Sequence, residues 1–348
     1  MAMKMPSRHS TMSVISLAGG ARRWGCDGAG SVVKVPTIAA IHAEATRIGF
    51  VACGLATLEP SRRGDALDRW LANGLAGTMR YLHRQAKKRK SPAGATKGAR
   101  TAVVVLENYA APASERPVSG DAFKIASYAR GTDYHMVTLA RLLVLAEWLK
   151  ANGAGLAHAW VDHAPIPERE LAERAGLGWI GKNTMLIHPR HGSYTFIGSV
   201  FTDLDLAPSQ PLGTDHCGSC TRCLDACPTQ AFVAPLVLDA TRCLSYLTIE
   251  YKGAPPADFV ARYDGWAFGC DVCNDVCPWN IKFAVPTTVE DFARRRDPDR
   301  RDANVFEQMT ETEFNRRFAD TGLARPGLAG MRRNVRAAIA SPRLDQDS

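Results

Sequence analysis

The amino-acid sequence predicts an α/β or α+β domain over residues 37–210, a cysteine-rich module over 211–285 and a basic helical region over 286–348. Three observations predict this order. Strand-length apolar runs alternate with helical patterns in the first part, eight of the ten cysteines lie between Cys217 and Cys277, and arginine-rich helical patterns follow them. The 348 residues, 46% hydrophobic and 22% charged, have an ordinary globular composition.

The elements of the first domain follow from apolar spacing. Residues 37–52 read as an amphipathic helix followed by a short buried segment, and residues 133–151 as a long helix stopped by Asn152-Gly153. Two further helices are expected over 70–82 and 166–175. The β-branched run 101–106 predicts a strand, and further strands are expected over 158–162, 185–188 and 194–202.

Residues 1–36 are expected to be a disordered extension. Their apolar stretch, 12–20, precedes Arg22 and Arg23, whereas a secretory signal carries its basic residues first. The chain also has no apolar run long enough to span a bilayer. We therefore expect a cytoplasmic protein that has no membrane partner and acts as a monomer.

Basic residues are clustered, and the net charge is +8 with a pI of about 9.0. Such clusters are usually solvated surfaces, but several together suit a polyanionic partner such as RNA. We expect phosphate contacts from the C-terminal clusters, which are Arg294 to Arg301 and Arg332 to Arg336.

The cysteine spacing is typical of iron–sulfur proteins. The first run is Cys-x2-Cys-x2-Cys-x3-Cys-Pro from Cys217, and the second is Cys-x2-Cys-x3-Cys-Pro from Cys270. In ferredoxin-like modules the cysteine before proline serves the other cluster. This rule assigns one 4Fe–4S cluster to Cys217, Cys220, Cys223 and Cys277, and a second to Cys227, Cys243, Cys270 and Cys273. Structural zinc is the alternative, which the two Cys-Pro steps disfavour.

Three strings carry a resemblance to a known family. Tyr-Ala-Arg-Gly-Thr-Asp-Tyr-His from Tyr128, Val-Asp-His-Ala-Pro from Val161 and Glu-Arg-Ala-Gly-Leu-Gly-Trp-Ile-Gly-Lys-Asn-Thr from Glu173 resemble epoxyqueuosine reductases. The cysteine order after them matches the same family. The resemblance implies a nitroreductase-like, cobalamin-binding first domain beside the two clusters. It also implies reduction of epoxyqueuosine to queuosine at the wobble position of tRNA, with an external electron donor.

The resemblance implies a role for Asp162, whose position matches the family's proton donor. We expect burial to raise its pKa and so keep a proton available; a helix N-cap is the alternative. Other cobalamin contacts are expected from Arg80, Tyr128, Asp162, Asn183, Thr184, Ser245, Gly269, Asp271 and Val272. Lys182 could meet the corrin, a phosphate or solvent. His135 is not expected to ligate cobalt, since Thr138 stands where the histidine-ligation motif needs glycine.

Two other functions fit parts of the sequence. A reductive dehalogenase would use the same cofactors, but its export signal places paired arginines before the apolar stretch. A ferredoxin-type electron carrier would not need the first domain.

Overall fold

The computed structural model of the chain describes residues 35–112, 120–162, 164–293 and 298–342. The extension expected over 1–36 therefore lies outside the described residues up to position 34. Cys26, His163 and the cluster Arg294 to Arg296 also lie outside them. From residue 35 onward the described residues form one compact unit.

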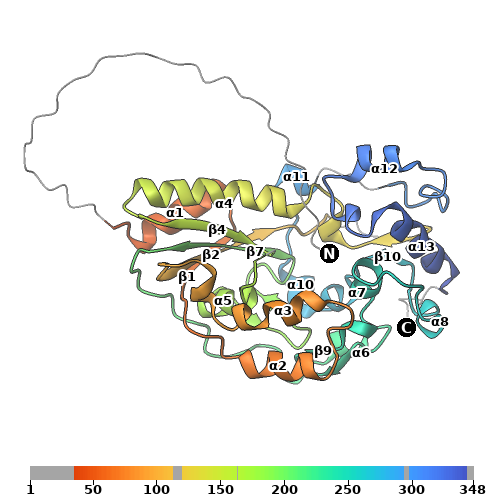
Figure 1. Cartoon of the computed structure of the whole chain (residues 1–348), viewed down its shortest axis with the longest axis horizontal. Helices are drawn as coiled ribbons and strands as arrows, with labels where there is room; N and C mark the ends of the chain where they lie inside the picture. The colour runs from red at the N-terminus through yellow and green to blue at the C-terminus, as the bar shows by residue number, and fades with distance from the viewer. Residues whose placement is uncertain (1–34, 113–119, 163, 294–297, 343–348) are drawn as a thin grey trace, which may run out of the picture. The chain divides into compact units, whose positions relative to one another are not determined.

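A four-stranded antiparallel sheet is the centre of the first domain. Its strand order is β1-β2-β7-β4, with β1 at Ala52–Thr57, β2 at Thr101–Asn108, β7 at Thr195–Thr202 and β4 at Ala157–Val161. Helices α1 (Ile38–Ile48) and α4 (Tyr134–Ala151) cover one face, and α5 (Glu168–Arg174) packs on the other (Figure 1).

Coverage of both faces explains the continuous apolar run in β2. Side chains alternate across a strand, so Val103 and Val105 meet the core of α1 and α4, while Val104 and Leu106 meet the core of α5. Every residue of β2 is buried as a result. The strand predicted over 101–106 is confirmed, and so are the strands expected after it.

The helix ends follow standard capping chemistry. The Thr37 hydroxyl accepts a hydrogen bond from the Ala40 amide at 3.2 Å to begin α1, and Gly49 ends the helix with a φ of 107°. Asp133 caps α4, which ends before Asn152 as predicted. Pro167 precedes α5, so Asp162 is not the N-cap of that helix.

The helix predicted over 70–82 is wrong. The chain forms α2 (Gly64–Ala72) and α3 (Arg80–Arg89) with a break between them. Gly74 and Gly77 adopt positive φ angles of 71° and 56° in that break. A Cβ on Gly77 would lie 2.5 Å from the Tyr246 hydroxyl, so the break also permits a close contact with the cysteine-rich module.

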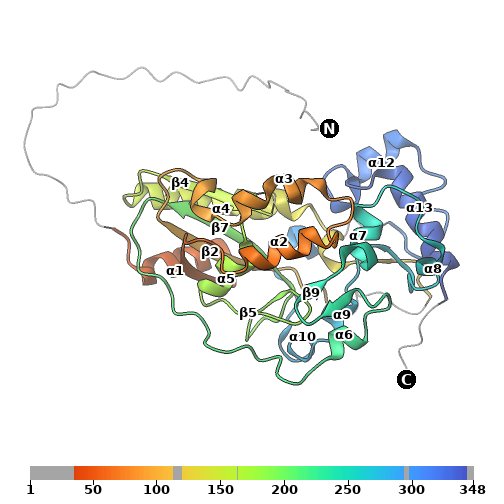
Figure 2. The same ribbon diagram turned by 60° about the horizontal axis from the view of Figure 1, so that its bottom comes forward.

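Short elements make up the cysteine-rich module. Helices α6 (Arg222–Asp225), α9 (Val272–Asp275) and α10 (Pro278–Phe283) lie together (Figure 2). The others are α7 (Leu244–Ile249), α8 (Ala257–Val260) and the hairpin of β8 (Phe232–Ala234) and β9 (Val237–Leu238). Before the module, β5 (Trp179–Ile180) pairs with β6 (Leu186–Ile187).

The segment after β2 ties the first domain to the rest of the chain. Strand β3 (Lys124–Ile125) pairs in parallel with β10 (Trp266–Phe268), and Lys124 forms a buried ion pair with Asp264 at 2.8 Å. The C-terminal helices α11 (Glu290–Ala293), α12 (Glu311–Phe318) and α13 (Gly327–Ala340) follow, and α12 and α13 add an aromatic core around this segment.

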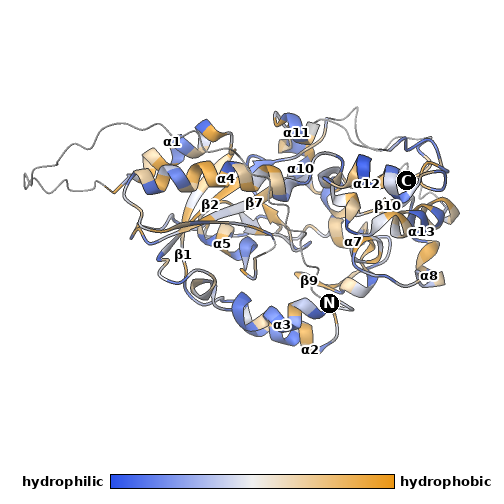
Figure 3. Ribbon diagram, turned by 45° about the horizontal axis from the view of Figure 1, so that its top comes forward, coloured by the Kyte–Doolittle hydropathy of each residue, from blue (hydrophilic) through white to orange (hydrophobic). Residues whose placement is uncertain are grey.

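Hydropathy differs sharply between two of the helices. Figure 3 shows α3 as largely hydrophilic and α4 as rich in apolar residues. None of the helices in the described ranges has both the length and the apolar character that a membrane span requires.

Candidate functional site

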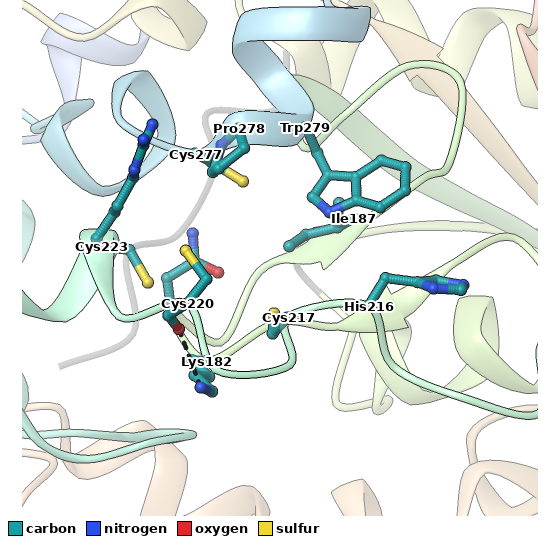
Figure 4. A pocket seen from close by; sticks show the side chains of 11 residues that line it. Lys182, Ile187, His216, Cys217, Cys220, Cys223, Cys277, Pro278 and Trp279 are labelled. Atoms are coloured by element: carbon teal, nitrogen blue, oxygen red, sulfur yellow. Dashed lines mark hydrogen bonds between the residues drawn. The ribbon is translucent and has the colours of Figure 1, made fainter.

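Four cysteines of the first predicted set line one pocket. Cys217, Cys220 and Cys223 come from the loop that leads into α6, and Cys277 comes from the residue before α10 (Figure 4). The fourth thiol therefore belongs to the second half-motif. The structure brings together the set that the spacing rule assigned to one cluster.

Aromatic and basic groups form the rest of this pocket. The Trp179 ring lies 4.8 Å from His216 and 4.9 Å from Trp279 between centroids. The Lys182 ammonium donates to the carbonyls of Gly218 at 2.6 Å and Cys220 at 2.9 Å. Lys182 thus fixes the cysteine loop, a role that the sequence interpretation did not include.

The second predicted set gathers around α7 and α9. Cys273 lies within electrostatic range of Cys227 and Cys243, and Cys270 of Cys243 and Cys273. Burial raises the pKa of the Cys270 and Cys273 thiols well above their usual value. A soft, thiophilic metal centre would compensate that cost by drawing out the thiolates.

The donor chemistry of both sets fits iron–sulfur clusters. Every predicted ligand is a sulfur atom. The thiol of Cys243 also receives hydrogen bonds from the Ser245 hydroxyl and from the Ser245 and Tyr246 backbone amides, which suit a thiolate. Within the described ranges, no group of three or more His, Cys, Asp or Glu side chains is arranged to hold a single metal ion.

A second constellation surrounds Asp162 at the end of β4. The Tyr134 hydroxyl donates to Asp162 Oδ2 at 2.5 Å, and His135 Nε2 lies 3.4 Å from the same oxygen. His135 Nδ1 lies 2.7 Å from Asp133 Oδ1. The start of α4 therefore places a phenol and an imidazole against one carboxylate, with a second carboxylate behind the imidazole.

Charge in this constellation is distributed differently from our expectation. Burial alone would raise the pKa of Asp162, but hydrogen bonds from His135 and Tyr134 and the charge of His135 hold it well below its usual range. Burial opposes the charged form of His135, yet its two carboxylate partners raise its pKa to about 9. At neutral pH the carboxylate is ionised, and the proton resides on the imidazole.

Several predicted cofactor contacts lie between Asp162 and the second cysteine set. Tyr128 is within electrostatic range of both Asp162 and Cys243. Asp271 accepts a hydrogen bond from the Ser127 amide at 2.7 Å, and the Gly269 amide donates to Thr248. Val272 begins α9, and Ser245 contacts Cys243.

The other predicted contacts are placed elsewhere. Arg80 is exposed at the start of α3. Asn183 lines the first cysteine pocket and donates to the Cys273 carbonyl at 3.3 Å. Thr184 has a φ of 66°, and its carbonyl accepts a hydrogen bond from Arg169.

Sequence reasoning missed four residues that face Asp162. Tyr81, Tyr134, Glu168 and Arg325 all lie within its electrostatic range. Tyr134 stands within the recognised Asp-Tyr-His string, so its position was a usable signal. Glu168 and Arg325 have no such signal, because only the folded chain brings them to this carboxylate.

Two family models match separate parts of the chain. Residues 216–280 match the 4Fe-4S double cluster binding domain, and residues 89–162 match the domain described as epoxyqueuosine reductase QueG. An α/β domain that carries a carboxylate–imidazole network and is joined to a 4Fe–4S domain defines an iron–sulfur oxidoreductase.

Curated relatives make the assignment specific. An epoxyqueuosine reductase of Cellulophaga algicola is 39% identical over 85% of this chain and 95% of its own. That of Pseudomonas aeruginosa is 39% identical over 84% of this chain and 82% of its own. The chain belongs to the epoxyqueuosine reductase family.

Solved structures agree with this family. An epoxyqueuosine reductase crystallised with an epoxyqueuosine-modified tRNA-Tyr stem loop matches with a TM-score of 0.78 and 30% identity, over 86% of this chain and 80% of that one. The Bacillus subtilis reductase matches with a TM-score of 0.75, 29% identity and the same coverage. Its structure is described as having a catalytic aspartate loop swung out of the active site.

Proposed function

We propose that this chain reduces epoxyqueuosine to queuosine at the wobble position of tRNA. The observation that carries the proposal is the Asp162 network, which lies within electrostatic range of the second cysteine set through Tyr128. A proton source and an electron source therefore adjoin one space. A relative crystallised with an epoxyqueuosine-modified stem loop supports the substrate class. Such a substrate places the activity in the cytoplasm.

The residues present fit the cofactors that this reaction needs. Each predicted cysteine set would hold one 4Fe–4S cluster. Cobalamin would bind the nitroreductase-like first domain between Asp162 and the segment of Ser245, Gly269 and Asp271. When bound, these groups supply two electrons from an external donor to the epoxide. The protein must add two protons and keep the reacting oxygen in place.

Asp162 is positioned to deliver a proton to the departing oxygen. Its carboxylate is ionised at neutral pH, so the proton must come from a neighbour. The His135 imidazolium lies 3.4 Å away and is held by Asp133 on its other side. Movement of the His135 proton to Asp162 would load the acid, and the charge of Asp133 would keep the imidazole oriented.

The mobility of such an aspartate has a parallel in a relative. In the Bacillus subtilis reductase a catalytic aspartate loop can swing out of the active site. Asp162 has a positive φ of 37°, which is sparsely populated for a residue with a side chain. We infer that the turn after β4 is the corresponding catalytic loop.

Phosphate contacts are better placed on α3 than on α13. Arg332 donates to the Phe306 and Met309 carbonyls, and Arg333 donates to those of Tyr251 and Gly253. We call these two arginines the α13 pair, and their internal bonds leave little for RNA.

Helix α3 instead offers a basic surface. Arg84, Lys87 and Lys88, here called the α3 basic face, are exposed and have no hydrogen-bond or ion-pair partner among the described residues. The same helix carries Tyr81, which lies within electrostatic range of Asp162. We propose that the α3 basic face holds the tRNA backbone beside the active site.

Nucleoside analysis tests the proposed function in cells. A strain that lacks this protein should accumulate epoxyqueuosine in its tRNA, and the intact gene should restore queuosine. Normal queuosine in the deletion strain would refute the proposed substrate, provided that no second reductase is present.

A further inference from the structure

A second carboxyl group lies behind Asp162 and has no part in the steps described so far. Glu168 is the first residue of α5, and its carboxylate accepts a hydrogen bond from the backbone amide of Asp162. Its Oε1 atom is buried and has no hydrogen-bond partner among the described residues. One carboxyl group therefore holds the backbone of the catalytic turn and also presents an oxygen without a partner.

The groups that face Glu168 come from four elements. They are Asp162 in the turn after β4, Arg169 on α5, Arg89 on α3 and Tyr134 on α4. Burial raises the pKa of Glu168 to about 8, and the charge of Asp162 adds to this. The Asp162 amide and the two arginines act in the opposite direction.

Arg89 does not neutralise this carboxyl through a direct bond. Its Nη1 atom is 3.5 Å from the Ile166 carbonyl, and its Nε atom is itself buried without a hydrogen-bond partner in the described part of the chain. Glu168 is consequently a neutral carboxylic acid beside an ionised one at neutral pH. Such separation of two neighbouring carboxyl groups is typical of acid–base sites.

We propose that Glu168 stores the second proton of the reaction and reloads Asp162 with it. This inference rests on the proposed function. Removal of the epoxide oxygen consumes two electrons and two protons, and the oxygen leaves as water. When the Glu168 O–H bond breaks, an O–H bond forms on Asp162. Glu168 is left as a carboxylate, which then recovers a proton from solvent.

Single-turnover rates in the loaded holoenzyme test this role. Glu168→Gln keeps an oxygen that can accept the Asp162 amide but cannot store a proton. We expect its rate to fall by at least about 10-fold below about pH 8. We also expect it to lack the decline that the wild-type protein shows as pH rises through about 8, where Glu168 ionises.

Two further variants separate positioning from proton storage. Glu168→Ala removes the amide acceptor as well and should fall further. Glu147→Gln changes an exposed carboxyl of α4 in the same way and should behave as wild type. A Glu168→Gln enzyme with the wild-type rate and the wild-type pH profile would overturn the proposal.

Infrared spectroscopy gives a second measurement that does not need turnover. In holoenzyme labelled with 13C-glutamate, a carbonyl band of a protonated glutamic acid should disappear with a midpoint near 8 and be missing from Glu168→Gln. If the wild-type protein holds no such band at neutral pH, the proposal is wrong even if the variants fail to fold. Failure of the wild-type protein to convert epoxyqueuosine would instead refute the proposed function.

Discussion

Replacement of Asp162 by asparagine should separate proton delivery from the architecture of the site. The amide keeps an oxygen that can accept the Tyr134 hydrogen bond, which is 2.5 Å long in the native site. It removes the negative charge and the ability to carry a proton. A general acid contributes about 10²- to 10⁴-fold to a rate, so we expect single-turnover conversion to fall by about that factor, or roughly 3–5 kcal/mol in the activation barrier.

The same substitution should leave a measurable trace on His135. The imidazole has two carboxylate partners, and the Asp133 contact of 2.7 Å is shorter than the Asp162 contact of 3.4 Å. Asp133 should therefore retain more than half of the effect that raises the pKa of His135 to about 9. We expect this pKa to fall to roughly 8 in Asp162→Asn.

Nucleoside mass spectrometry of an epoxyqueuosine stem loop gives the rate, and NMR titration of labelled histidine gives the pKa. Iron and cobalamin contents must match the wild-type protein for the comparison to hold. Near-normal turnover in Asp162→Asn would refute proton delivery by this residue. A His135 pKa that does not change would refute the electrostatic coupling.

Three more outcomes follow from the structure. Cys273→Ser should lower iron content from about eight to about four atoms per chain, whereas Cys53→Ser, in the core of the first domain, should leave it unchanged; equal iron in both proteins would remove the ligand assignment. Alanine substitution of the α3 basic face should shallow the salt dependence of tRNA binding by about 0.7 in logarithmic slope for each lost contact, and the same change at the α13 pair should not; the reverse result would place the RNA on α13. Burial lowers the pKa of His188 to about 4, so the unfolded chain binds the extra proton, and unfolding free energy should drop by about 3 kcal/mol as pH falls from about 6.5 to about 4; chemical denaturation of His188→Gln should lack that drop.

Local chemistry made most of the first domain predictable. The strand at β2 and the helix at α4 have periodicities that buried faces require, and their boundaries follow from the caps at Asp133 and Asn152. The helix predicted over 70–82 failed because Gly77 serves a contact with Tyr246, which is distant in sequence. Periodicity cannot report such a contact.

The candidate site was predictable only in part, for a related reason. Cysteine spacing is a local constraint, and it led to the set of thiols that shares one pocket. The charge state of Asp162 depends on His135, which belongs to a different element, and our expectation of a raised pKa had the wrong direction. Glu168 was visible as an acidic residue in a helix, but its contact with the Asp162 amide exists only in the folded turn.

Conversion of tRNA by purified protein tests the central claim most directly. Protein prepared without oxygen, loaded with iron, sulfide and cobalamin, and given a low-potential reductant should turn an epoxyqueuosine stem loop into the queuosine form. Mass spectrometry would show the loss of one oxygen atom. If protein with full iron and cobalamin content left the epoxide unchanged, the reductase function argued from the Asp162 network and the cysteine sets would be contradicted.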